Sequence, residues 1–207
     1  MPDVPQADLA SAYNMRVPTL EAVCAEVEVL LRSILNQTPR IDKIAARTKD
    51  TERFVEKAAR RDQTTGELKY PQPLEEIQDQ IALRVVVYFN SDVPPVREKV
   101  LQEFREIEDV RKEEPDPGKF GYEAHHFVCV IPPDIIARHH SPVEFFELQV
   151  STLFQHAWAE ANHDLGYKET TPLTYDQRKQ IAWAAAQAWG ADEIFQSLWN
   201  TVRAQST

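Results

Sequence analysis

The chain is poor in cysteine and in basic residues, and each shortage excludes a class of protein. Its 207 residues include only two cysteines, Cys24 and Cys129, which lie in apolar surroundings without the spacing of metal ligands. We expect them to be buried free thiols of a cytoplasmic protein. Lysine and arginine number 23 against 33 aspartate and glutamate, for a formal net charge of −10. This balance argues against binding to nucleic acid mainly by bulk charge, although a local basic cleft stays compatible with it.

Long apolar runs are also missing. No stretch approaches the roughly 20 residues that a membrane helix needs, and the N-terminus lacks the apolar region of a signal peptide, so we expect no contact with a membrane. Apolar residues at 43% and charged residues at 27% permit a sizeable core and exclude wholesale disorder. The length predicts a single domain over residues 1–207. Its parts are an N-terminal segment and helix at 1–38, a core at 39–170 and C-terminal helices at 171–207.

Apolar periodicity and turn residues predict an α+β fold, in which a mixed β-sheet of about five strands is flanked by helices. Residues 1–17 are expected to be loosely held and 108–118 to form a mobile loop, because the latter is charged and contains two prolines and a glycine. The expected helices are about 19–36, 51–61 (capped by Thr51), 92–106, 151–163, 175–189 and 192–203. The expected strands are 41–46, 83–89, 125–131 and 145–150.

A row of cations begins the second expected helix. Lys49, Arg53 and Lys57 recur at four-residue spacing and therefore share one helix face, and Arg47 precedes them. Such a row beside a helix N-terminus can bind a polyphosphate. The alternative is an ordinary solvated surface.

Two carboxylates occupy positions that suggest a magnesium site. Asp79 comes just before the strand at 83–89, whereas Glu147 lies within an apolar strand and shares one strand face with Gln149. A carboxylate there is costly unless something pairs with it, and a magnesium ion shared with Asp79 would do so. Alternatively, Asp79 is a plain loop residue and Glu147 forms a salt bridge with an arginine.

Two further groups of residues could carry chemistry. His156, Glu160 and His163 share one face of a helix, where they could bind zinc or support the neighbouring strand through hydrogen bonds.

Gly121 and Tyr122 precede His126, and an exposed Tyr122 could stack on a nucleotide base. A tyrosine that packs in the core is the alternative.

In chain order these features resemble the synthetase domain of the RelA/SpoT family, the pyrophosphokinases that make pppGpp and ppGpp. The resemblance spans about residues 40–168. The motifs that carry it are Arg47-x-Lys49 with Lys57, Asp79-x-x-Ala82-x-Arg84, Gly121-Tyr122-x-x-x-His126, and Phe146-Glu147-Leu148-Gln149-Val150-x-Thr152 followed by His156-Ala157-Trp158-Ala159-Glu160, His163 and Tyr167-Lys168.

The resemblance implies a nucleotidyltransferase-like fold and a Mg²⁺-dependent reaction. The β,γ-pyrophosphoryl group of ATP would pass to the 3′-hydroxyl of GDP or GTP, which suits a chain that offers cations for phosphates and carboxylates for metal. By this resemblance, Arg47 and Arg84 would bind the adenine of ATP, and Lys49 and Lys57 would bind its phosphates. The acceptor would be bound by Tyr122, His126, Gln149 and His156. Asp79 and Glu147 would bind the metal ion, and Glu147 would also activate the acceptor hydroxyl.

The chain departs from the family pattern at four positions. Glu123 and Ser151 stand where arginine is expected, Arg53 where serine is usual, and Ala82 where glycine is usual. These departures keep two alternatives open. One is a toxic relative that pyrophosphorylates the 3′ end of tRNA or makes adenosine alarmones, and the other is a degraded relative that only binds a nucleotide or a partner. A separate hydrolase domain is not expected, because the His163-Asp164 pair lies inside the synthetase block.

The C-terminal helices are rich in tryptophan. Trp183, Trp189 and Trp199 fall within about 17 residues, more than a small tail can bury alone. They either cover the core or form an interface. By resemblance to small family members, that interface would join copies of this chain or bind an antitoxin.

The charge of Glu123 leads to a test of acceptor recognition. A glutamate beside the 5′-phosphates of an acceptor repels them, so Glu123→Arg is expected to tighten GDP binding about tenfold. Isothermal titration with GDP measures this effect. Guanosine, which has no phosphate, serves as the control ligand and should bind both proteins equally; unchanged GDP affinity would remove the repulsion argument.

Overall fold

The computed structural model describes residues 6–62, 64–112, 120, 124–167 and 173–205. Its centre is a five-stranded sheet in the order β1-β2-β5-β4-β3. Strands β2 and β5 run parallel, and the other neighbouring pairs are antiparallel, so the sheet is mixed. The expected fold class is confirmed. The strands are β1 (Ile41–Thr48), β2 (Ile81–Val87), β3 (Glu106–Lys112), β4 (Ala124–Val130) and β5 (Phe145–Thr152).

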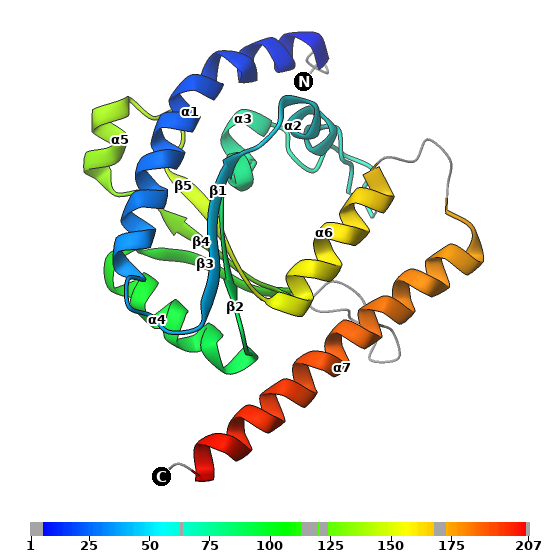
Figure 1. Cartoon of the computed structure of the whole chain (residues 1–207). Helices are drawn as coiled ribbons and strands as arrows, with labels where there is room; N and C mark the ends of the chain where they lie inside the picture. Colours follow the sequence, from blue (N-terminus) through cyan, green and yellow to red (C-terminus); the bar gives the residue numbers. More distant parts are fainter. Residues whose placement is uncertain (1–5, 63, 113–119, 121–123, 168–172, 206–207) are drawn as a thin grey trace.

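Helices cover the two faces of the sheet unequally (Figure 1). α1 (Gln6–Ile34), α4 (Val93–Glu103) and α5 (Pro133–His139) enclose one face, while α6 (Leu153–Tyr167) lies over the other and α7 (Tyr175–Gln205) packs against α6. No helix in the described ranges combines the length and apolar character of a membrane span. The remaining short elements are α2 (Thr51–Ala58), α3 (Pro73–Glu76), η1 (Gln78–Gln80) and η2 (Asn90–Asp92).

Strand alternation separates an apolar face from a polar one. Leu83, Phe127 and Leu148 belong to the hydrophobic core shared with the helices of the first face. Both cysteines are buried free thiols, as expected, and burial raises the pKa of Cys24 to about 11 and that of Cys129 to about 12. The opposite face carries the polar side chains of the strands, which are described below.

The expectation that residues 1–17 are loosely held is wrong for the described residues, because α1 begins at Gln6 and continues through Pro18. Tertiary contacts hold this segment. The ring of Tyr13 is fully buried and stacks on Phe54 with a centroid distance of 3.9 Å, and its hydroxyl donates a hydrogen bond to the carbonyl of Lys49 at 2.9 Å. Packing against α2 therefore extends the helix well before the expected start at residue 19.

Two local expectations are also corrected. Asp50, not Thr51, caps α2, and its carboxylate accepts hydrogen bonds from the amides of Glu52 and Arg53. The part of the expected loop from 108 to 112 belongs to β3, an edge strand paired with β4, and Arg97 bridges its residues Glu106 and Asp109. After β4, Pro132 and Pro133 begin α5, in which proline occupies the first turn.

The two expected C-terminal helices are one continuous helix, α7. Gly190 lies between the two expected helices; it has no atom near the position of a Cβ and continues the helix. Two contacts fix α7 to the sheet. Asp192 is buried and accepts a hydrogen bond from the Thr152 hydroxyl at 2.7 Å, while the ring of Trp199 stacks on Phe89 with a centroid distance of 5.1 Å.

The buried Asp192 contact predicts how firmly α7 is held. Asp192→Ala leaves the Thr152 hydroxyl without an acceptor, so the free energy of unfolding should fall by about 1–3 kcal/mol. Urea denaturation measures this change. Glu193→Ala, at the neighbouring exposed position of the same helix, is the matched control and should stay within about 0.5 kcal/mol of the wild type. Equal stability of the two variants would mean that this contact does not fasten α7.

Candidate active site

Several predicted site residues lie on the polar face of the sheet, in two adjacent rows that run across the strands. In one row, Arg47 pairs with Ala82, which in turn pairs with Glu147. In the next row, Arg84 pairs with Gln149, which pairs with His126. The register thus brings together residues that are up to about 100 positions apart in the sequence.

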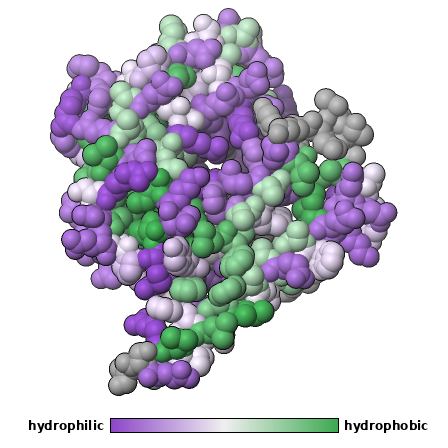
Figure 2. Space-filling model, in the orientation of Figure 1, coloured by the Kyte–Doolittle hydropathy of each residue, from purple (hydrophilic) through white to green (hydrophobic). Residues whose placement is uncertain are grey.

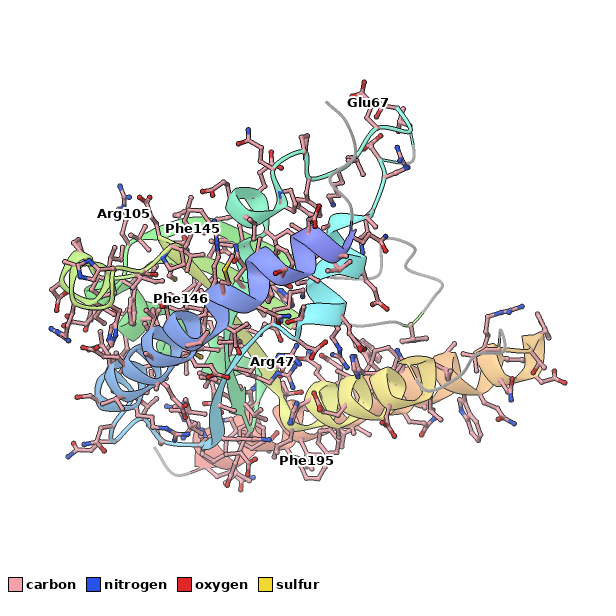
Figure 3. The ribbon with its side chains drawn as sticks, turned by 90° about the horizontal axis from the view of Figure 1, so that it is seen from above. Arg47, Glu67, Arg105, Phe145, Phe146 and Phe195 are labelled. Carbon is pink, nitrogen blue, oxygen red and sulfur yellow. The ribbon has the colours of Figure 1, made fainter. Side chains whose placement is uncertain are left out.

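Arg47 and Arg84 are diagonal neighbours on β1 and β2, because Arg47 faces Ala82 and Ala45 faces Arg84. Figure 3 shows Arg47 on the side of β1 that faces α6. Diagonal side chains on antiparallel strands stand about 7–8 Å apart. That spacing equals two stacking distances of about 3.5–4 Å.

Several polar groups surround the guanidinium of Arg84. Its Nη1 donates to a carboxylate oxygen of Glu160 and lies 3.2 Å from Nδ1 of His156, while its Nη2 donates to Oε1 of Gln149 at 3.2 Å. Burial, followed by the charge of Arg84, lowers the pKa of His156. Burial opposes ionisation of Glu160, but the hydrogen bond and charge of Arg84 lower its pKa overall. Glu160 is therefore anionic and His156 largely neutral near pH 7.

Glu147 is almost completely buried and is paired with two neighbours. Its Oε1 accepts a hydrogen bond from the Gln149 amide at 2.7 Å and lies 2.5 Å from Nδ1 of His126. Histidine and glutamine thus hold the carboxylate in place on the polar face.

Asp79 sits between two lysines. Its carboxylate oxygens lie 2.7 Å from Nζ of Lys49 and 3.0 Å from Nζ of Lys57. Burial lowers the pKa of Lys49, and the charge of Asp79 opposes this shift. Asp79 belongs to η1, which directly precedes β2 and contacts β5, the strand of Glu147. The two carboxylates thus come from neighbouring parts of the sheet.

An open cleft adjoins this cluster. It has a volume of about 420 Å³ and lies where β1 passes into α2. Lys49 precedes α2, so the expectation that it shares a helix face with Arg53 and Lys57 is wrong. Arg47, Lys49 and Arg53 line the cleft, and Lys49 and Lys57 both lie beside Asp79. Figure 2 shows hydrophilic side chains on the surface around this part of the molecule. The remaining residues of the lining are Thr48, Asp50 and Glu52.

The donor set of the site suits magnesium better than zinc. Asp79 and Glu147 offer carboxylate oxygens, and magnesium is commonly held by one or two carboxylates together with substrate phosphates. Oδ1 of Asp79 is buried and accepts no hydrogen bond, although Lys57 neutralises it. The zinc alternative is not supported, because His156 and Glu160 both contact Arg84, and the described residues include no group of three or more potential zinc ligands.

Some predicted residues are not placed by the structure. Gly121, Tyr122, Glu123 and Lys168 lie outside the described residues. Ser151 is buried on β5. The sequence also missed one link, the pairing of Glu160 with Arg84. The spacing of His156 and Glu160 signals a shared helix face, but only the packing of α6 over β2 shows what that face contacts.

Comparison with known proteins identifies the family. The family model described as "Region found in RelA / SpoT proteins" matches residues 46–172. The GTP pyrophosphokinase YjbM of Bacillus subtilis (strain 168) is 24% identical over 183 residues, which cover 87% of this chain and 82% of that protein.

Solved structures share the fold. The small alarmone synthetase 1 of Bacillus subtilis superposes with a TM-score of 0.74 at 21% identity, covering 93% of this chain and 98% of that one. Other structures of that synthetase contain its product pppGpp or AMPCPP. A GTP pyrophosphokinase family protein from Streptococcus pneumoniae gives a TM-score of 0.71 at 26% identity and covers 91% of this chain and 92% of its own.

The mixed sheet, with arginines and carboxylates on one face under α6, defines a protein of the alarmone-synthetase fold. The chain belongs to the RelA/SpoT family, since the matching region includes more than half of it.

Proposed function

We propose that this protein is a Mg²⁺-dependent pyrophosphokinase that transfers the β,γ-pyrophosphoryl group of ATP to the 3′-hydroxyl of GDP or GTP. The observation that carries the proposal is the burial of Glu147 on the same face of the sheet as Arg47 and Arg84. A base for a hydroxyl and a slot for a purine thereby share one surface. The names of its relatives, GTP pyrophosphokinase and small alarmone synthetase, support the same reaction.

ATP would bind at the β1 side of the sheet. Arg47 and Arg84 would stack on the two faces of adenine, and Lys49 and Lys57 would turn from Asp79 to the phosphates. Both lysines already lie within ion-pair distance of one carboxylate, so they converge on a single anionic position before the nucleotide arrives. This convergence orders the cations in advance and lowers the cost of binding.

The acceptor would bind at the β4 and β5 side, with its base on Tyr122 and its ribose near Gln149, His126 and His156. Glu147 would take the proton of the 3′-hydroxyl, and the resulting oxygen would attack the β-phosphorus of ATP. The bond from that phosphorus to the α,β-bridging oxygen would break, and AMP would leave. Gln149 and His126 hold the carboxylate that receives the proton.

Asp79 and Glu147 would hold the magnesium ion. When bound, the ion supplies positive charge to phosphate oxygens on which negative charge accumulates during transfer. The two lysines beside Asp79 supply further positive charge at the same place.

The same proposal includes a cytoplasmic location and an assembly through α7. Trp183, Ile194 and Leu198 of this helix are 68%, 62% and 54% exposed. Figure 2 shows apolar surface along the C-terminal half of α7. Such a patch is typical of an interface with another copy of the chain or with an antitoxin.

A transfer assay tests the reaction. Incubation with γ-labelled ATP and Mg²⁺ should place the label on GDP or GTP, and should release AMP in equal amount. Parallel reactions with ADP and with deacylated tRNA distinguish the other acceptors. Label on tRNA alone would reassign the protein to the tRNA-modifying class, and the absence of transfer to every acceptor, together with measured ATP binding, would leave a nucleotide-binding protein.

Two substitutions test the carboxylates. Glu147→Gln keeps the shape of the side chain but removes the base, so kcat should fall about 10²–10⁴-fold. Asp79→Asn removes one metal-binding charge and should reduce transfer to background. Glu144→Gln, an exposed position just before β5, is the matched control and should retain activity. Circular dichroism checks that each variant is folded; substantial turnover in folded Asp79→Asn or Glu147→Gln protein would contradict the two-carboxylate site.

A further inference from the structure

Both terminal nitrogens of the Arg84 guanidinium are anchored. Nη1 contacts Glu160 and His156 of α6, and Nη2 contacts Gln149 of β5. A guanidinium has donors in its plane and none on its two faces. Anchoring both terminal nitrogens in the plane therefore fixes the orientation of the plane and leaves the faces available for stacking.

The contacts with α6 are suited to this role. A guanidinium only donates hydrogen bonds, so Nδ1 of His156 must be the acceptor, which requires the neutral imidazole favoured by its lowered pKa. Glu160 lies one helical turn further along and supplies the negative charge. Its side chain is 59% exposed, so it contributes little to the core.

We propose that Glu160 is a positioning residue for the donor nucleotide: it holds the plane of Arg84 in the orientation that stacks on the purine of ATP. The inference rests on the proposed function, because it takes ATP as the donor. It assigns to α6 a part in donor binding through one ion pair with β2. Gln149 extends the same chain of contacts to Glu147, which lies 2.7 Å from the Gln149 amide.

A binding experiment tests the inference without requiring transfer. Isothermal titration with AMPCPP, in which the α,β-bridging oxygen is replaced and no transfer can occur, should show about three- to tenfold weaker binding for Glu160→Ala. Glu160→Gln retains an acceptor oxygen and should lose less. Glu193→Gln, on the exposed surface of α7, removes a charge elsewhere and should bind like the wild type.

A double-mutant cycle shows whether the effect passes through Arg84. Once Arg84→Ala has removed the guanidinium, adding Glu160→Ala should change the AMPCPP dissociation constant by less than about twofold. In steady-state assays, Glu160→Ala should raise KM for ATP with little change in KM for GDP. Unchanged AMPCPP binding in Glu160→Ala, additive losses in the double variant, or an effect confined to GDP would each overturn the inference.

The two proposals fail separately. A wild-type protein that binds AMPCPP but transfers no label refutes the proposed reaction, and the cycle still decides the role of Glu160. A wild-type protein that transfers label while the cycle is additive retains the reaction and rejects the positioning role. Thermal melting of the Glu160 variants checks that they remain folded, which the exposure of this side chain leads us to expect.

Discussion

The site depends on one constraint, which is that a polar face of a β-sheet must be enclosed without leaving its charges unpaired. Burying a charged group is costly unless a partner compensates it. The sheet meets this requirement by pairing its polar residues with each other and with α6: Glu147 with Gln149 and His126, and Arg84 with Glu160. The residues that satisfy the electrostatics of the fold are thus the same ones to which the proposed function assigns the nucleotides.

Two clusters of opposite character divide this region. The first, Lys49, Lys57 and Asp79, lies at the entrance to β2 and carries a net positive charge, which is suitable for phosphates. The second, around Glu147, is anionic or neutral and suits the activation of a hydroxyl. An acidic protein can still bind polyanionic nucleotides in this way, because the local arrangement of charges, rather than the net charge of −10, determines the field at the cleft.

The sequence was sufficient for the fold class and for most of the strands, because β2 and β5 have strong apolar patterns and the site motifs fall on them. It was insufficient where tertiary contacts decide the outcome. Tyr13 anchors a segment that was expected to be loosely held, and the strand at Glu106–Lys112 has a charged sequence but is held by pairing with β4. The pairing of Glu160 with Arg84 could not be predicted either, since the residues are 76 positions apart and the register between α6 and β2 is not encoded in local spacing.

The hydroxyl of Tyr13 bonds the carbonyl of Lys49, while its ring stacks on Phe54 in the following helix. The N-terminal part of α1 therefore supports the backbone that carries Lys49. Removing the N-terminal residues to obtain a more compact protein would remove the contacts of Tyr13 with Lys49 and Phe54 and so loosen that backbone. Expression designs should therefore keep the whole of α1 and place any affinity tag at the opposite end.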